Sequence, residues 1–155
     1  MNPIVEALHG SELIDIERIV QTASFAMRKM ELPEDAEVSI SFVSDEEIAE
    51  LNEAYRGKEG PTDVLSFECD NLDDGFPASE DAGEPYSLGD VIIALDVASR
   101  QAEEYGSSLA DEVDLLLVHG ILHLCGYDHI EDADAEVMEP LQDSILAELR
   151  TSRGL

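Results

Sequence analysis

Basic residues and cysteines are scarce in this chain of 155 residues. Eight Lys and Arg residues stand against 37 Asp and Glu residues, so the formal net charge is −29. The two cysteines, Cys69 and Cys125, form no C-x-x-C pair, and two cysteines do not make a disulfide framework. We therefore expect a reduced, cytoplasmic protein.

Long hydrophobic runs are missing as well. The most apolar stretch, residues 115–125, is interrupted by two histidines and is too short to cross a bilayer. The N-terminus has no basic start and no apolar core of the signal-peptide kind, so we expect neither a signal peptide nor a membrane partner. A hydrophobic content of 44% predicts a single domain over residues 1–155 with its own core.

Three of the four histidines lie close together in the sequence, at His119, His123 and His129. Residues four apart on a helix are about 40° apart on one face, so His119 and His123 can bind the same ion. A continued helix would turn His129 about 120° away, so the helix has to end before it. Gly126 is suited to that end, because glycine adopts the left-handed conformation without a Cβ clash. Three imidazoles around a zinc-like ion leave a coordination position open for water, which is typical of a catalytic site.

Two neighbouring positions limit the chemistry of this histidine motif. Metzincin proteases share its spacing but carry a glutamate, their general base, directly after the first histidine. This chain has Gly120 there, so a metalloprotease is a weaker alternative. Cys125 comes two residues after His123 and points away from it on a helix, so we interpret it as a buried filler and not as a ligand.

Helical and alternating apolar patterns predict an α+β fold, with a small mixed β-sheet, helices packed around it, and the metal site on a buried helix and the turn after it. Ser107 or Ser108 should cap that helix. A proline at position 140 should kink or split the last helix. The expected helices are 11–30, 44–57, 96–105, the histidine helix and 131–150; the expected strands are 38–42, 64–68 and 89–95, with an acidic surface loop at 70–87.

Three ordered motifs then point to a family: LNEAYRGKEGPTDVLSF from Leu51, LGDVIIA from Leu88 and VHGILHLCGYDH from Val118. Together they resemble the YbeY-type rRNA maturation endoribonucleases, and the resemblance runs from about Val38 to Leu149. It implies a single-domain, metal-dependent, single-strand-specific endoribonuclease that acts in small-subunit ribosomal RNA maturation and ribosome quality control.

The resemblance also implies roles for individual residues and partners. His119, His123 and His129 match the ligands of one divalent ion, for which Zn²⁺ is our expectation, and Arg56 matches the active-site arginine of the family. The implied partners are ribosomal RNA, a small-subunit ribosomal protein and an Era-type GTPase, with no DNA. The family often carries a glutamate where this chain has Gln142, which puts a role for that carboxylate in doubt.

In the mechanism that follows, the ion lowers the pKa of bound water or acts as a Lewis acid on a phosphoryl oxygen. Arg56 holds the scissile phosphate, although an arginine at a helix C-terminus can also be a simple capping residue. Since Gly120 replaces a base, three routes for the proton stay open: the metal hydroxide, the 2′-OH of the RNA, or an unrecognised carboxylate.

The net charge of −29 conflicts with an RNA substrate, because phosphate contacts normally contribute much of the affinity for RNA. Either high salt screens the field, or a small basic patch carries the chemistry. Arg56 and Lys58 would begin this patch and bind substrate, joined by Arg28, Lys29 or Arg100. The charge also favours a different function, a mainly non-catalytic ribosome-assembly factor that docks a basic protein or a GTPase.

Overall fold

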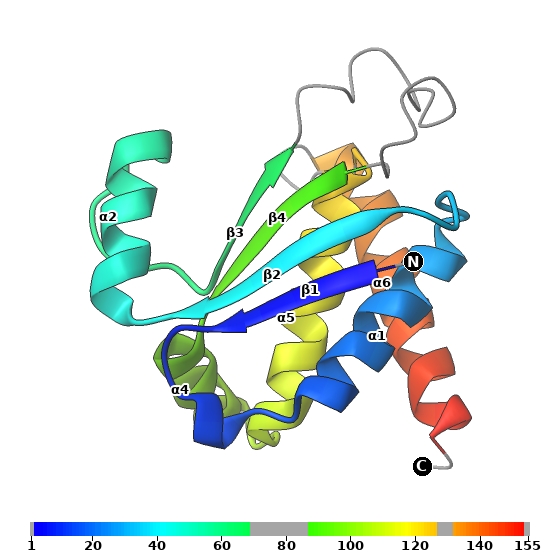
Figure 1. The fold of residues 1–155 in the computed structure, drawn as a ribbon, viewed down its shortest axis with the longest axis horizontal. Helices are drawn as coiled ribbons and strands as arrows, with labels where there is room; N and C mark the ends of the chain where they lie inside the picture. The colour runs from blue at the N-terminus through cyan, green and yellow to red at the C-terminus, as the bar shows by residue number, and fades with distance from the viewer. Residues whose placement is uncertain (1, 69–86, 127–131, 154–155) are drawn as a thin grey trace.

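A four-stranded sheet forms the centre of the protein in a computed structural model (Figure 1). The strand order is β1-β2-β4-β3. β1 (Asn2–Ala7), β2 (Glu37–Val43) and β4 (Ser87–Ala94) run parallel, and β3 (Val64–Glu68) pairs antiparallel with β4. The expected α+β class with a mixed sheet is confirmed. The structure describes residues 2–68, 87–126 and 132–153, so most of the expected acidic loop and the third histidine lie outside the described residues.

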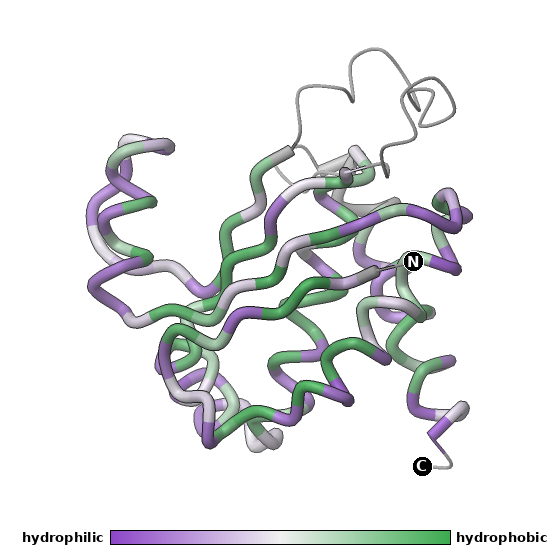
Figure 2. The backbone as a smooth tube through the Cα atoms, viewed as in Figure 1, coloured by the Kyte–Doolittle hydropathy of each residue, from purple (hydrophilic) through white to green (hydrophobic). Residues whose placement is uncertain are grey.

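Helices cover the two faces of the sheet unequally. α1 (Ile16–Lys29), α5 (Leu109–Leu124) and α6 (Asp132–Ser152) lie on one side, where the main core forms (Figure 1). α2 (Asp45–Arg56) packs on the opposite face in a smaller cluster. α4 (Leu95–Tyr105) connects β4 to α5. Figure 2 shows hydrophobic residues along the strands and many hydrophilic residues on α2. No helix among the described residues is long and apolar enough to cross a membrane.

Local signals set the ends of the two helices that matter for the site. The Ser44 hydroxyl accepts from the Glu47 N–H in a capping box at the start of α2, and Gly57, with φ of 67°, ends it. The Ser108 side chain accepts from the backbone N–H of Asp111, 3.1 Å away, at the start of α5. Gly126 follows α5 with φ of 97°. The predicted ends of both helices are confirmed.

Three sequence-based expectations need correction. The first helix begins at Ile16, after a short 3-10 helix η1 (Ser11–Leu13), because the Asp15 side chain caps it. β1 was not expected at all; it is an edge strand, where a proline at position 3 is tolerated. α6 runs through Pro140 as one helix and is not split, since packing of Met138 and Ile145 in the main core holds both sides of the proline.

A buried polar cluster fastens the helices of the main layer to one another. The Asp114 carboxylate of α5 accepts hydrogen bonds from Arg18 Nη2 at 2.7 Å and Thr22 Oγ1 at 2.9 Å, both of α1. Its third donor is Arg153 Nη1 at 2.8 Å, directly after α6. The bond to Asp114, followed by the attraction of its charge, raises the pKa of Arg18. The cluster therefore joins residues from three separate segments at the end of α5 away from the histidines.

Candidate active site

The buried helix α5 carries the first two histidines on one face. Its sequence is apolar on nearly every side, and most of its residues are buried against the sheet or neighbouring helices. His119 and His123 are half-buried, so their rings reach the surface from a firmly packed helix. A firmly packed helix suits metal ligands, because their side chains have to be held in a narrow range of positions.

The two imidazole rings face each other through their Nε2 atoms, which lie 3.1 Å apart. The rings meet edge to face, with centroids 4.6 Å apart. On the far side of the first ring, His119 Nδ1 donates to Gln142 Oε1 of α6 at 2.8 Å. A proton on Nδ1 leaves the Nε2 lone pair of a neutral His119 available to a metal. Gln142 thus orients His119 in the way that outer-shell partners orient metal-ligating histidines.

This pair fits a tetrahedral metal ion. Two nitrogens bound to zinc at about 2.05 Å would lie about 3.3 Å apart, close to the 3.1 Å observed between His119 and His123. His129 lies outside the described residues, and among those that are described no three His, Cys, Asp or Glu side chains converge on one point. The three-histidine site therefore stays a prediction, with two of its donors correctly placed for it.

Gly120 explains why no acid follows the first histidine. A Cβ at this position would lie 2.8 Å from Val91 Cγ1 and 3.2 Å from Ser66 Oγ, so α5 approaches the sheet too closely for a side chain there. The Ser66 hydroxyl also donates to the Gly120 carbonyl at 3.3 Å. A glutamate at position 120 would collide with the sheet, which removes the general base on which the metalloprotease alternative depends.

Arg56 and Lys58 are exposed at the end of α2, and the described residues offer neither of them an ion-pair partner. Tyr55 meets Phe67 of β3 edge to face at 5.3 Å, whereas the next strand residue, Ser66, contacts α5. Tyr55 of α2 and the histidine helix α5 therefore contact opposite faces of β3, the edge strand. No contact within the described parts of the chain joins Arg56 to the histidine pair.

The wider basic patch does not form as expected. Arg100 pairs with Asp45 at 3.0 Å, at the opposite end of α2 from Arg56. Lys29 pairs with Glu148 of α6 at 2.9 Å, and Arg28 precedes it on α1, which packs on β1 at the far edge of the sheet. The expectation that Arg28, Lys29 or Arg100 joins Arg56 and Lys58 is wrong, because Arg28 and Lys29 lie on the helix that packs on the far edge strand and Arg100 pairs with Asp45 at the other end of α2.

A pocket beside the histidines contains a residue that the sequence analysis did not single out. Glu112 is only 3% exposed and lines this pocket together with His119 and Gln142. Burial, followed by repulsion from Asp63, raises the pKa of Glu112. The sequence did contain a signal for Glu112: it lies seven residues before His119, a spacing that places both residues on one helix face. Gln142 had no such spacing signal, because its contact with His119 joins two helices, and only the family resemblance drew attention to its position.

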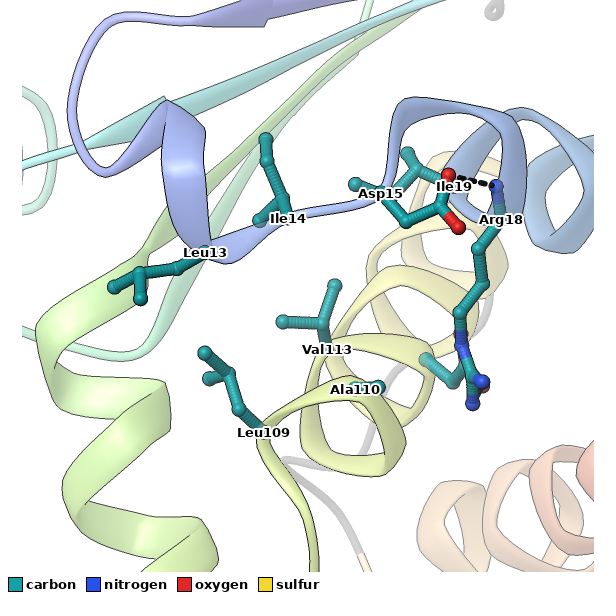
Figure 3. Close-up of a pocket in the computed structure, with 9 residues that line it drawn as sticks. Leu13, Ile14, Asp15, Arg18, Ile19, Leu109, Ala110 and Val113 are labelled. Carbon is teal, nitrogen blue, oxygen red and sulfur yellow. Dashed lines mark hydrogen bonds and ion pairs between the residues drawn. The ribbon is translucent and has the colours of Figure 1, made fainter.

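Two other features lie near α5. Cys125 packs against the main core, where burial raises the pKa of its thiol to about 11, as expected of a filler. A second pocket lies between the start of α1 and the start of α5 and is lined mostly by aliphatic side chains such as Leu109 and Val113 (Figure 3). Its charged lining residues are already engaged, because Asp15 caps α1 and Arg18 bonds Asp114.

Comparison with known proteins decides the family. The family model described as endoribonuclease YbeY matches residues 9–150. The chain belongs to the YbeY family. The expectation drawn from the motifs is thereby confirmed.

Relatives from distant bacteria agree with this assignment. A protein of Moorella thermoacetica named endoribonuclease YbeY is 48% identical over 139 residues, which cover 89% of this chain and 87% of that one. Another protein of the same name, from Macrococcus caseolyticus, is 43% identical over 145 residues, which cover 94% of this chain and 88% of that one. The solution structure of TM1509 from Thermotoga maritima superposes with a TM-score of 0.65 at 27% identity, covering 98% of this chain and 91% of that one. The fold shared with TM1509 thus extends over nearly the whole chain.

Proposed function

We propose that this YbeY-family protein is a metal-dependent, single-strand-specific endoribonuclease that matures small-subunit ribosomal RNA in the cytoplasm and takes part in ribosome quality control. The observation that carries the metal dependence is the pair of Nε2 atoms 3.1 Å apart, with His119 oriented by Gln142. Membership of a family named for endoribonuclease activity supports RNA as the substrate.

In this proposal His119, His123 and His129 hold one divalent ion, Zn²⁺. When bound, such an ion supplies a hydroxide near neutral pH or polarises a phosphoryl oxygen. Gln142 Oε1 accepts a hydrogen bond from the Nδ1–H of His119 and so keeps the ring in the tautomer that presents Nε2. The packing of α5 on the sheet keeps His119 and His123 in place while the substrate enters and leaves.

The cationic residues act on the phosphate. Arg56 has an exposed guanidinium, whose planar fork can donate two parallel hydrogen bonds to the scissile phosphate and offset the charge of the transition state. Lys58 adds a second positive charge two residues later. Since β3 is the edge strand of the sheet, RNA bound along this edge can contact both Arg56 and the histidines, and we expect a single strand to fit there better than a duplex.

Metal analysis of purified protein tests the proposal. We expect one ion per chain, and sharply weaker metal binding with a retained melting temperature when His119, His123 or His129 is replaced by alanine. Cleavage of single-stranded ribosomal RNA fragments should stop on chelation and return with Zn²⁺. His9→Ala is the matched control, since His9 bonds Asp96 near the start of α4, away from the candidate site. Absence of any specific ion would contradict the proposal.

The net charge supports one alternative function, that of a ribosome-assembly factor. The net charge of −29 suits a basic partner, so the protein would serve mainly as an assembly factor that docks a small-subunit ribosomal protein or an Era-type GTPase. Under this alternative the histidine variants retain partner binding and the purified protein cleaves no RNA. Measuring cleavage and partner binding on one preparation separates the two functions.

A further inference from the structure

The pocket next to His119, called the Glu112 pocket below, has no role in the chemistry described so far. Its wall includes Asp63 before β3, Tyr105 at the end of α4, and Glu112, Leu116 and His119 on α5. Because His119 is part of this wall, a group bound in the pocket lies beside the proposed metal and phosphate site.

Glu112 indicates that the pocket takes a hydrogen-bond donor. Glu112 is only 3% exposed and lines the pocket, and none of the described residues donates a hydrogen bond to its carboxylate. A buried carboxylate without a partner costs stability that a ligand donor would recover. No lysine or arginine lines this pocket, so nothing in it is suited to bind a phosphate. The Asp63 carboxylate already accepts from the Val64 N–H at 2.8 Å, which leaves Glu112 as the main open acceptor.

We propose that the Glu112 pocket binds a guanine base of the RNA, from a nucleotide next to the scissile phosphate, and so sets where the enzyme cuts. This inference rests on the proposed endoribonuclease function. The N1–H and N2 amino groups of guanine form two adjacent donors that match one carboxylate. Leu115 and Leu116 provide an apolar surface, and the ring of Tyr105, which is 69% exposed, stands at the rim where a base can stack.

The other bases fit this wall less well. Adenine offers one amino group beside an acceptor nitrogen, and inosine lacks the N2 amino group of guanine, so each loses one bond to Glu112. An arginine side chain of a protein partner would also match a carboxylate. The base is favoured over it because His119, which the proposed function assigns to the metal that acts on the RNA phosphate, also lines this pocket.

Nucleotide binding tests the inference without relying on catalysis. The full-length protein is titrated with guanosine, inosine and adenosine 5′-monophosphates while the methyl NMR signals of Leu115 and Leu116 are followed. The three probes share a phosphate, so differences report the base. We expect guanosine monophosphate to bind about ten-fold or more tightly than the other two. Equal binding of all three, or a response only to an N-acetyl arginine amide, would overturn the inference.

A single substitution links the pocket to cleavage. Glu112→Gln keeps the size of the side chain but places an amide donor against guanine, so we expect loss of the preference for guanosine monophosphate and a shift of RNA cleavage sites away from guanine. Glu103→Gln, an exposed change on α4 outside the pocket, is the matched control. Unchanged cleavage sites in Glu112→Gln would refute the guanine pocket. Guanine binding by a protein that cleaves no RNA would instead refute the nuclease function and leave the pocket standing.

Discussion

Two acids of α5 lie two positions apart and have opposite surroundings. Asp114 is 5% exposed and accepts hydrogen bonds from two arginines and a threonine. Glu112 is 3% exposed and faces a pocket whose lining contains no cation. A helix turns about 200° over two residues, which directs Asp114 to α1 and Glu112 to the histidine side. The same kind of carboxylate therefore stabilises the fold at one position and costs stability at the other.

The pKa of Glu112 predicts how this cost depends on pH. Burial raises the pKa of Glu112 above 4.5, so the folded protein holds this proton more tightly than the unfolded chain. The contribution of Glu112 to the free energy of unfolding is therefore favourable at low pH and is lost as pH rises from about 4.5 through the raised value. We expect Glu112→Gln to be more stable than the parent at pH 7, and this gain to shrink as pH falls through the raised pKa toward 4.5 and to level off below it.

Urea unfolding of both proteins across this pH range measures the difference. Taking the difference cancels the titration of the other carboxylates, which are common to both. Glu103→Gln removes one exposed charge and serves as the control. A gain that stays constant with pH would show that ionisation of Glu112 is not its cause.

Arg56 offers a second test at the residue scale. Arg56→Lys keeps the charge but loses the planar fork, and loss of a well-placed donor costs roughly 3–4 kcal/mol, about a hundred- to thousand-fold in rate. We expect RNA cleavage to fall by this factor while metal content and melting temperature stay unchanged. If Arg56 only caps α2, lysine serves nearly as well and cleavage persists. Cleavage and metal content measured on one preparation decide between the two.

At the scale of elements, the position of α5 depends on one close contact with the sheet. Gly120→Ala would place a Cβ 2.8 Å from a methyl group of the fully buried Val91. Overpacking of this kind costs roughly 1–3 kcal/mol, against a gain in helix propensity of up to about 1 kcal/mol. We expect a net loss of stability and weaker metal binding, because the shifted backbone carries His119.

A double-mutant cycle identifies the contact. Val91→Ala alone should destabilise by opening a cavity, but in the Gly120→Ala background it should cost less, since it makes room for the new methyl group. Thermal unfolding of the parent, both single variants and the double variant supplies the four values. Strictly additive losses would mean that Gly120 and Val91 do not restrict each other.

At the scale of the whole molecule, the Asp114 cluster joins segments that are far apart in the sequence. Asp114→Asn leaves Arg18 and Arg153 without their common carboxylate, and loss of one partner from a buried ion pair costs about 3 kcal/mol or more. Asp111→Asn is the control: Asp111 bonds the same Arg18 at 3.3 Å with a side chain that is 40% exposed, so we expect less than about 1 kcal/mol. Similar losses in both variants, measured by urea unfolding, would contradict a special role for burial.

The net charge of the molecule predicts an unusual salt dependence. Among the eight basic residues, Arg18, Lys29, Arg100 and Arg153 are paired with acids, so little cationic surface is left to attract RNA. Added KCl should therefore first raise the rate of RNA cleavage by screening the acidic surface, and lower it only at higher concentration. Initial rates over a KCl series check this. A cleavage rate that falls steeply from the lowest KCl concentration onward would reveal a dominant basic patch, and would contradict the explanation that the acidic surface repels RNA.

What the sequence determined by itself was the local framework. The capping box at Ser44, the glycine ends of α2 and α5, and the spacing of His119 and His123 on one helix face all depend on residues within a few positions of each other. Hydrogen bonds and periodicity over that range are properties of the chain alone. The motifs added the YbeY family, which the comparisons confirmed.

Tertiary structure decided everything that joins distant segments. The pairing of β1 with β2, the bond from His119 to Gln142, the approach of Gly120 to Val91 and the shared wall of the Glu112 pocket link residues far apart in the chain. It also placed Tyr55 of α2 and the histidine helix α5 on opposite faces of an edge strand. No periodicity encodes such contacts, because they depend on which helix covers which face of the sheet, and that choice is made by burial of the whole core.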